Sequence, residues 1–589
     1  MPGTFHGYRI LRSGDLSLLY RNGEIRQVCL GKVRVLNAIY TAVRVQNWTT
    51  VPFIVVQEVV KESPDGFTIE TELEHSMDKI HYRSQISIES KGTHLTFHYD
   101  GTAGSSFLRN RIGLCILHPV NECRGKQVTI THPDNTHSQG RFPDLIRPDQ
   151  PFFNISGMTW KPGEGITAKL AVDGEVFETE DQRNWTDASY KTYGTPLGKP
   201  FPVQVQKGEK VNQSVSLLVE QKPKSGQVTA SISSLADKRI LKIHPDKTYP
   251  LPGLGPGRTA GAIPLTGEAS EMLSALPFHH YRVDLQLNKY GWEADYDSVA
   301  SEQKQLGWPL ELVLHFGSRA KKELDTFLEH YSLNPVKIRH LLVFDQYFLS
   351  NSKLLKQVVP GLKAVLPDIP VGGGTDANFA ELNRNPPDPE LLDFITYSIC
   401  PQIHAIDNLT LVENLEAQSD SVSSAISLLN KPVIIGAVTL KKRFNAVATD
   451  DEDESQAMPE PDPRQHTGFA AGWTLGSIRN LALAGAASLT YFETVGPRGI
   501  LSNPDLSGRL SPLYHLFKEI LTGPMQVIHT KSSHPLEFDA LALQGNKEGK
   551  LLIANFADTE LSIEMEGLPD IPHRLTLKPS EIHKITYIP

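Results

Sequence analysis

The pattern of apolar residues changes near residue 222, and this change constrains the fold more than any other feature of the sequence. Before it, polar and apolar residues alternate with a period of two, as in GFTIETELEH (66–75) and HLTFHYDG (94–101). Such alternation is typical of antiparallel strands that bury one face. After it, short and nearly continuous apolar runs alternate with helical patterns. Strands buried on both faces and separated by helices indicate parallel β/α architecture, so we expect a multidomain chain with all-β and α/β parts.

Residues 1–222 carry the signals of a large N-terminal β-sandwich. The segment DLSLLYRNGEIRQVCL (15–30) has two apolar runs around an Asn-Gly pair, which is the strongest short-range signal for a hairpin. Further strand patterns include RIGLCILHP (111–119), ITAKLAVDGEVFETE (166–180) and SVSLLVE (214–220). Turn signals recur between these strands and no long amphipathic helix interrupts them, as expected for a sandwich.

Residues 223–525 are predicted to form a (β/α)8 TIM barrel, the catalytic domain. Seven apolar runs lie at 280–287, 310–316, 338–346, 369–377, 394–404, 431–440 and 488–496. Helical patterns such as AKKELDTFLEHY (320–331) and HTGFAAGWTLGSIRNLALAGA (466–486) separate them. The span suits a barrel with insertions, although an eighth strand has no clear candidate. The acidic and Pro-rich segment 449–465 is expected to be a long exposed loop, and nothing in the sequence decides whether it is a lid.

Residues 526–589 return to strand patterns, among them LEFDALALQ (536–544), KLLIANFAD (550–558) and EIHKITYIP (581–589). A small C-terminal β-sandwich is the simplest account. A chain of 589 residues is too long for one core, which agrees with about three domains.

Composition excludes several classes of function. The net charge is −9 and no Lys/Arg-rich run occurs, so nucleic acid is not expected as a partner. The four cysteines are widely spaced, without the spacing of a disulfide framework or a zinc site. No apolar run approaches the roughly 20 residues of a membrane span, and the first residues lack the apolar stretch of a signal peptide, so we expect no membrane partner and a cytoplasmic location. The oligomeric state is not indicated.

The predicted barrel strands end in ionisable side chains. Active sites of β/α barrels lie at the C-terminal ends of their strands, so these side chains are candidates for chemistry. In chain order they are Asp284, His315, Asp345, Asp376, His404, Lys441 and Glu493. Ordinary capping of a solvated rim explains two or three such residues, whereas here every recognised strand has one.

Glu381 and Glu493 are the predicted catalytic carboxyls. Glu381 follows three glycines in GGGTDANFAELNRN (372–385), and Glu493 ends the aromatic-rich strand LTYFETVG (489–496). Barrel glycosidases use two facing carboxyls, one as acid/base and one as nucleophile. Two alternatives stay open: Asp376 can take the place of Glu381, which then only stabilises a helix N-terminus, and Glu493 can form an ion pair with Arg498.

Asp376, Asn383, His404 and Asp345 are predicted to bind substrate at the same end of the barrel. His404 can equally be a structural histidine. No metal is predicted, because no His, Cys or acidic motif has metal-ligand spacing, although Asp345, His404 and Glu493 can assemble as ligands in space. A nucleotide-binding loop and a serine-hydrolase elbow are also absent, so no cofactor is expected.

The segment EDQRNWTDASYKTY (180–193) resembles neither a core strand nor a linker, since it holds three aromatic residues among charged ones. Trp185 can stack on a sugar ring, and Arg183 can donate hydrogen bonds to hydroxyls or a carboxylate. We therefore predict both as substrate-binding residues. The alternative is a polar interface between domains in which the same side chains pair with the barrel.

Four segments together resemble the D-apionate lactonase family of bacterial apiose catabolism. They are VFETEDQRNWTDASYKTYGTPLGKPFP (176–202), RNRIGLCILHP (109–119), GGGTDANFAELNR (372–384) and CPQIHAID (400–407). The resemblance covers most of the chain and implies a hydrolase that opens D-apionolactone, a branched sugar-acid lactone, to D-apionate. It assigns no catalytic residue. The layout of domains alone would favour the alternative, a retaining glycoside hydrolase acting on a sugar, and a non-catalytic carbohydrate-binding protein is the third and weakest possibility.

Overall fold

A computed structural model describes residues 4–222, 238–261, 265–444, 460–502 and 510–589. The described chain divides into two compact units. The first holds residues 4–183 and 188–222. The second holds residues 184–187 together with the described residues from 238 onwards, so a four-residue segment between strands of the first unit groups with the second.

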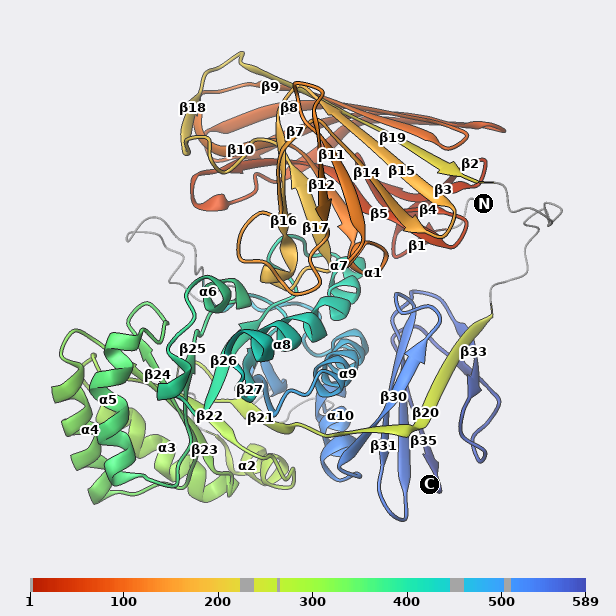
Figure 1. The fold of residues 1–589 in the computed structure, drawn as a ribbon. Coiled ribbons are helices and arrows are strands. Elements are labelled where there is room, and N and C mark those ends of the chain that lie inside the picture. Colours follow the sequence, from red (N-terminus) through yellow and green to blue (C-terminus); the bar gives the residue numbers. More distant parts are fainter. Residues whose placement is uncertain (1–3, 223–237, 262–264, 445–459, 503–509) are drawn as a thin grey trace. The chain divides into compact units, whose positions relative to one another are not determined.

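The first unit is a β-sandwich of two antiparallel sheets, as predicted (Figure 1). One sheet has the order β1 (Thr4–Phe5), β2 (Tyr8–Ser13), β3 (Leu16–Arg21), β4 (Glu24–Leu30), β5 (Val33–Val45), β10 (Phe107–Pro119), β17 (Ser189–Tyr193), β16 (Phe177–Asp181) and β13 (Phe152–Ile155), with β18 (Val203–Val205) beside β10. The other has the order β12 (His137–Arg141), β11 (Gln127–Thr131), β14 (Gly157–Gly163), β15 (Ile166–Asp173), β19 (Lys210–Gln221), β9 (His94–Ala103), β8 (Ile80–Lys91), β7 (Gly66–Met77) and β6 (Phe53–Ser63).

The two sheets of the sandwich bury the apolar side chains that alternate along their strands. Along β8, for example, every second residue from Tyr82 to Ser90 is buried. Polar contacts also link the sheets, since the Tyr20 hydroxyl on β3 lies 2.7 Å from Thr71 Oγ1 on β7. Short helical turns, η1 (Gln46–Trp48), α1 (Val120–Cys123) and η2 (Gln182–Trp185), connect strands. The period-two prediction is thus confirmed by the burial pattern.

The second unit contains a closed barrel of parallel strands, which confirms the predicted TIM barrel. Its strands are β21 (Gly253–Gly257), β22 (Tyr281–Gln286), β23 (Leu310–Phe316), β24 (Ile338–Asp345), β25 (Val371–Gly374), β26 (Phe394–Ile399), β27 (Val433–Val438) and β28 (Ser488–Val495), and β29 (Gly499–Leu501) extends beside β28. Pairing of β21 with β28 closes the ring. The eighth strand missed in the sequence is therefore β21. Its sequence GLGPG has no apolar run, and a Cβ on Gly255 would lie 2.4 Å from the His280 carbonyl oxygen.

Helices cover the outside of the barrel (Figure 1). They are α2 (Gly267–Ser274), α3 (Trp292–Leu306), α4 (Ala320–Leu333), α5 (Ser352–Val365), α6 (Phe379–Arg384), α7 (Asn408–Glu413), α8 (Leu415–Leu429), α9 (Gly468–Leu483) and α10 (Pro512–Leu521), with the turn η3 (Pro389–Leu391) before β26. Side-chain caps start several of them; Asn351, for instance, accepts the backbone N–H of Leu354 at the start of α5. Most of the acidic loop predicted at 449–465 lies outside the described residues.

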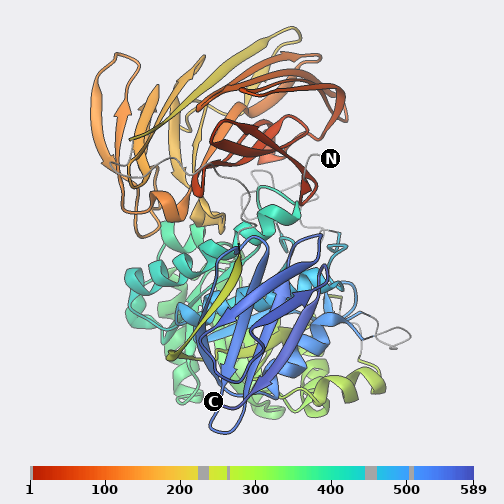
Figure 2. The same ribbon diagram turned by 90° about the vertical axis from the view of Figure 1, so that its right-hand side faces the viewer.

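The C-terminal strands form one seven-stranded sheet, which faces the viewer in Figure 2. Its order is β34 (Arg574–Leu577), β33 (Leu561–Glu566), β20 (Arg239–Pro250), β30 (Gln526–Ser532), β31 (Phe538–Gln544), β32 (Gly549–Asn555) and β35 (Ile582–Tyr587). β20 precedes the barrel in sequence, within the range predicted for the barrel domain, yet it pairs with β30 and β33. On β31, Phe538 and Ala540 belong to the sheet's apolar core, while the intervening Asp539 binds Arg479 of α9. The division at residues 222/223 and 525/526 stays a prediction.

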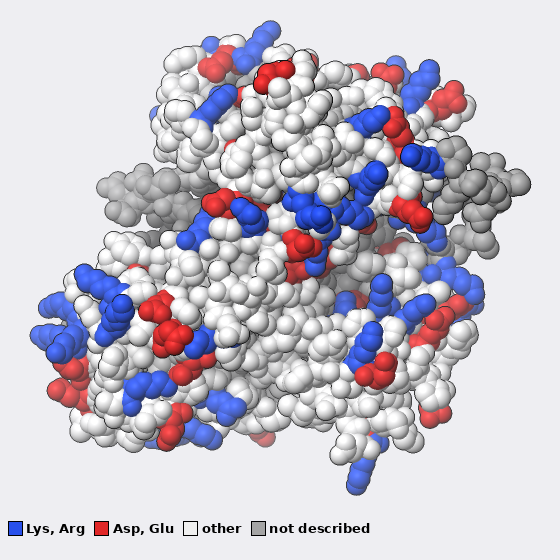
Figure 3. Space-filling view, viewed as in Figure 1, with Lys and Arg blue, Asp and Glu red and all other residues white. Residues whose placement is uncertain are grey.

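Charges on the described surface are mixed. Over the face drawn in Figure 3, Lys and Arg side chains lie among Asp and Glu side chains instead of forming one extended basic area. None of the described helices combines the length and the apolar character that a membrane span requires.

Candidate functional site

A cavity of about 580 Å³ lies at the C-terminal ends of the barrel strands. Its walls come from β22, β23 and β28 and from the segments that follow β21, β25 and β27. The polar side chains that line the cavity include Arg282, Asp284, His315, Asp376, Arg443 and Glu493. Strand geometry explains how β22 contributes two of them: side chains alternate along a strand, so Arg282 and Asp284 share the interior face.

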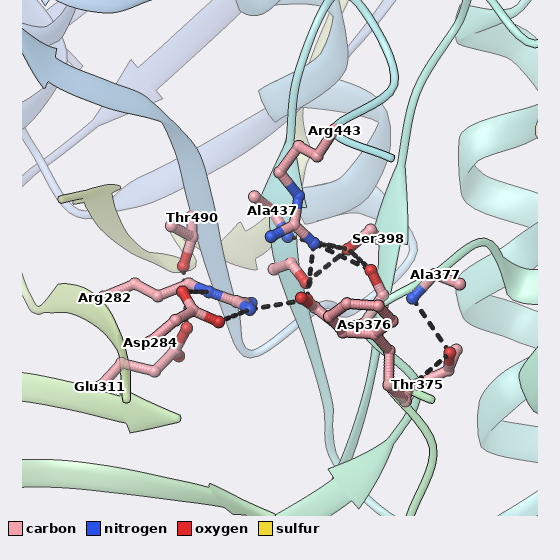
Figure 4. A network of polar contacts seen from close by, with 12 residues as sticks. Arg282, Asp284, Glu311, Thr375, Asp376, Ala377, Ser398, Ala437, Arg443 and Thr490 are labelled. Atoms are coloured by element: carbon pink, nitrogen blue, oxygen red, sulfur yellow. Dashed lines mark hydrogen bonds and ion pairs between the residues drawn. The ribbon is translucent and has the colours of Figure 1, made fainter. Parts of the chain in front are cut away.

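Two arginines hold Asp376 (Figure 4). Arg282 Nη2 donates to Asp376 Oδ1 over 2.6 Å, and Arg443 Nη2 donates to the same oxygen over 2.6 Å. The Asp376 side chain is 3% exposed, whereas that of Arg443 is 25% exposed and borders the cavity. Ser398 Oγ accepts a further hydrogen bond from Arg443 Nη2. Asp376 is therefore an anchor for two cations, with little surface left to contact a ligand.

Asp284 is the carboxylate that this network leaves accessible. Arg282 Nη2 donates to Asp284 Oδ1 over 3.0 Å, and His315 Nε2 lies 3.1 Å from the same oxygen. The Asp284 side chain is still 35% exposed, towards the cavity that it lines. Although burial alone would raise the pKa of Asp284, Arg282 and His315 lower it below 3.8. Asp284 is thus ionised at neutral pH and can accept a proton.

Glu493 faces the same cavity, but its pKa is shifted upwards, whereas that of Asp284 is shifted downwards. Burial raises the pKa of Glu493 above its ordinary 4.5, and the Ala260 backbone N–H and the charges of Arg498 and Arg443 offset this only in part. The Ala260 nitrogen lies 3.3 Å from Glu493 Oε2. Two carboxyls in one cavity whose environments move their pKa values apart are suited to act as a base and an acid.

Basic side chains gather on one part of the cavity wall. Lys441, Lys442 and Arg443 follow β27, and Arg498 follows β28. Lys442 is exposed, whereas Lys441 and Arg443 are half-buried. Such a group can stabilise negative charge that develops on a bound carbonyl oxygen.

Asp284, His315 and Asp376 each offer a ligand atom, and these atoms lie within 4.8 Å of one another. Aspartate and histidine suit several divalent ions. Arg282 Nη2, however, already donates to both carboxylates, so an ion bound there would meet a guanidinium that occupies the same lone pairs. The donor set therefore fits an arginine better than a metal ion.

Of the eight residues predicted from the sequence, Glu493 and Asp376 line the cavity, and the other six do not. Asp345 caps the turn after β24, where its Oδ1 accepts the backbone N–H groups of Tyr347 and Leu349. Glu381 lies on α6, with an Oε2 atom that is buried and has no hydrogen-bond partner among the described residues. Burial raises the pKa of Glu381 to about 7. Its pairing with Glu493 stays a prediction.

The predicted residues around 180–193 divide between the two units. Arg183 is fully buried in the first unit, and its Nε and Nη2 donate to the two carboxylate oxygens of Asp181 over 2.8 and 2.7 Å. Contact between Arg183 and a substrate would require this pair to open. Tyr190 and Tyr193, which belong to the same segment, are buried as well.

Residues 184–187 pack within the second unit. Asn383 Nδ2 donates to Asn184 Oδ1 over 2.9 Å, and His404 Nδ1 lies 2.6 Å from Asp187 Oδ2. The Trp185 ring meets His404 edge-on, with 6.3 Å between ring centroids, and Arg384 lies over its face at 5.4 Å. Trp185 and His404 thus contact each other, Asn383 contacts Asn184, and none of the three predicted ligands lines the cavity.

Sequence reasoning missed Arg282 and Arg443 and left Asp284 and His315 as strand ends without roles. A signal for Arg282 was present, because YRVDLQ alternates polar and apolar residues along its whole length. Arg443 had no comparable signal, since it follows β27 within the short basic run KKR.

Comparison with known proteins agrees with this architecture. A family model described as the D-apionate lactonase N-terminal domain matches residues 4–222, and one described as the D-apionate lactonase TIM barrel domain matches residues 254–524. A curated D-apionate lactonase from Brucella anthropi is 28% identical over 569 residues, which cover 90% of each chain.

Among solved structures, similar chains include a glycoside hydrolase family 30 xylanase from Clostridium acetobutylicum, with 11% identity, a TM-score of 0.40 and coverage of 59% of this chain and 99% of that one. A family 51 α-L-arabinofuranosidase from Bifidobacterium longum has 13% identity and a TM-score of 0.41, covering 59% and 94%. A β-arabinopyranosidase has 10% identity and a TM-score of 0.31, covering 98% of both chains.

Proposed function

Since the chain belongs to the D-apionate lactonase family, we propose that this hydrolase opens D-apionolactone to D-apionate in the cavity at the barrel mouth. The observation that carries this proposal is the pairing, in one cavity, of ionised Asp284 with Glu493, whose pKa is raised, beside a group of cations. Lactone hydrolysis needs a base for water, an acid for the leaving oxygen and stabilisation of an oxyanion.

Asp284 acts as the general base in this proposal. Its carboxylate takes a proton from a water molecule as the water oxygen bonds to the lactone carbonyl carbon. The electron pair of the carbonyl bond moves to the carbonyl oxygen, which becomes an oxyanion. Arg282 and His315 keep Asp284 ionised and fix its position, so that the base stands ready before substrate arrives.

The cations after β27 stabilise the oxyanion. Arg443 is the best placed, because Asp376 and Ser398 hold its Nη2 while a quarter of the side chain stays exposed at the cavity. A donor fixed in this way loses little freedom as charge develops. Lys442 adds positive charge at the same wall and favours the carboxylate of the product.

Glu493 acts as the general acid. When the tetrahedral intermediate collapses, the bond from the carbonyl carbon to the ring oxygen breaks, and Glu493 donates its proton to that oxygen. The product then carries a new hydroxyl and a carboxyl group, which releases its proton to solvent. Asp284 returns the proton it took to Glu493 through water, so that both groups regain their starting states.

The same two carboxyls suit a second reaction, cleavage of a glycosidic bond, where one carboxylate serves as nucleophile. The experiment that tests the proposal therefore supplies both substrate types. Purified protein is incubated with D-apionolactone and, separately, with aryl glycosides, while acid and aryl-group release are followed. Acid release far above the spontaneous rate is the expected result. Aryl release with an inert lactone would make the chain a glycosidase and refute the proposal.

A further inference from the structure

A fully buried carboxylate, Glu311, lies inside the barrel beneath the candidate site. It is the second residue of β23, so it sits near the N-terminal end of a strand whose other end carries His315. Thr490 Oγ1 donates to Glu311 Oε1 over 3.1 Å, and His340 Nδ1 and His280 Nε2 lie 3.7 and 4.0 Å from Oε2. A buried carboxylate with no direct access to the cavity is costly unless it has a function or a strong partner.

Glu311 is ionised in this position. Burial alone would raise the pKa of Glu311, but His340 and the charge of Arg282 keep it below its ordinary 4.5. Burial lowers the pKa of His280 to about 4, so His280 is uncharged at neutral pH. Arg282 is therefore the permanent positive charge among the groups that stabilise Glu311.

Gly436 makes room for Arg282 beside Glu311. A Cβ added to Gly436 would lie 2.7 Å from Arg282 Nη1 and 3.2 Å from Glu311 Oε1. Both polar groups thus converge on the space that this glycine leaves open. Figure 4 shows Glu311 and Thr490 on one side of the Arg282 guanidinium and Asp376 on the other.

Charges consequently alternate through the barrel interior. Glu311 is negative, Arg282 positive, Asp284 and Asp376 negative, and Arg443 positive. Without Glu311, the Arg282 guanidinium would be attracted only by the carboxylates of Asp284 and Asp376 and would move towards them. With Glu311 present, the guanidinium is also attracted from the other side by charge, although no hydrogen bond joins the two side chains, and this attraction limits how far it moves towards the carboxylates.

We propose that Glu311 is a positioning residue, which acts through Arg282 to hold Asp284 and Asp376 in place for the reaction. The role rests on the proposed lactonase function, but it concerns a residue that contacts neither substrate nor cavity. Glu311 belongs to a supporting layer with Thr490, which donates a hydrogen bond to it, and with Gly436, which leaves room for Arg282.

Two substitutions separate the charge of Glu311 from its shape. Glu311→Gln keeps the shape and removes the charge, while Glu311→Asp keeps the charge on a shorter side chain. We expect Glu311→Gln to lower kcat by about tenfold to a hundredfold with little change in KM, and Glu311→Asp to retain more activity than Glu311→Gln. Asp539→Asn is the matched control, since it removes another buried, arginine-paired carboxylate that does not line the cavity, and it is expected to affect stability alone.

Gly436→Ala provides an independent route to the same result. Its methyl group would lie closest to Arg282 Nη1 and would displace the guanidinium while every carboxylate stays in the chain, so it should lower kcat to a similar extent. A crystal structure of Glu311→Gln gives a readout that does not depend on activity, and Arg282 is expected to leave its position between Asp284 and Asp376.

The proposal is overturned if Glu311→Gln keeps kcat within twofold of the unsubstituted protein, if Glu311→Asp is the less active of the two, or if Arg282 is unmoved in the crystal structure. Failure of the proposed function looks different, because the unsubstituted protein would then not hydrolyse the lactone. The position of Arg282 in the Glu311→Gln crystal structure still decides the positioning role in that case.

Discussion

Replacement of Glu381 by Gln is predicted to stabilise the protein at alkaline pH. Glu381 lies on α6 with its Oε2 buried and without a hydrogen-bond partner among the described residues. Burial raises its pKa from 4.5 to about 7, and Arg384 offsets this only partly. Gln copies the shape of the neutral carboxylic acid and cannot ionise, so the substitution removes the cost of the buried charge alone.

The magnitude follows from the two pKa values. In the unfolded chain Glu381 ionises near pH 4.5, whereas in the folded chain it keeps its proton until about pH 7. Between these values the folded state binds more protons, so the free energy of unfolding falls as pH rises. At 1.36 kcal/mol per pKa unit, the full loss is about 3 kcal/mol. The advantage of Glu381→Gln should therefore be near zero at pH 4 and reach about 3 kcal/mol at pH 8.

Urea unfolding of both proteins at pH 4, 6 and 8 measures this difference. Glu390→Gln, an exposed glutamate close to α6, is the matched control and should show no such rise. A difference that stays constant with pH, or a Glu381→Gln protein that is less stable at pH 8, would show that Glu381 does not carry a raised pKa in the folded protein. The same variant tests the sequence prediction for Glu381: we expect lactonase activity within about threefold of the unsubstituted protein, whereas a catalytic carboxyl would lose about a hundredfold or more.

Three further predictions concern the site. The value of kcat/KM should fall at low pH, where Asp284, whose pKa is lowered, gains a proton. It should also fall at high pH, where Glu493, whose pKa is raised, loses its proton. Glu493→Gln should abolish this fall at high pH. Arg443→Gln should lower kcat about 10²- to 10³-fold in steady-state assays if it stabilises the oxyanion, and an unchanged kcat would exclude that role. Trp185→Ala should lower thermal stability by about 1–2 kcal/mol through loss of its ring contacts while KM for the lactone stays within about twofold; a large rise in KM would favour sugar stacking instead.

Periodicity was sufficient to predict most of the fold. Strands with strict alternation, such as β8, and strands buried on both faces, such as β23, have burial patterns that follow directly from their sequences. β21 could not be recognised because close packing requires glycines in this strand, and glycines give no pattern of buried apolar side chains. β20 was not among the predicted strands, and its partners in the sheet lie about 280 residues later, which no local signal indicates.

The sequence predicted where the candidate site lies, at the C-terminal ends of the barrel strands, but not the function of each side chain there. Strand ends directed attention to Asp284, His315 and Glu493, and the structure brings all three to one cavity. Glu381 was preferred because it follows three glycines in the sequence, but it lies on α6 and is not among the residues that line the cavity. Which carboxylate is neutralised depends on pairs such as Arg443 with Asp376, which are 67 residues apart in sequence. Pairing of this kind is set by three-dimensional packing, and it decides which acid can react.

The roles of Asp284 and Glu493 in lactone hydrolysis are best tested by measuring acid release from D-apionolactone at constant pH with the unsubstituted protein, Asp284→Asn and Glu493→Gln. We expect rapid hydrolysis by the unsubstituted protein and a loss of about 10²-fold or more in each variant, while circular dichroism shows that both variants are folded. Hydrolysis no faster than the spontaneous reaction, or variants that keep full activity, would contradict these roles.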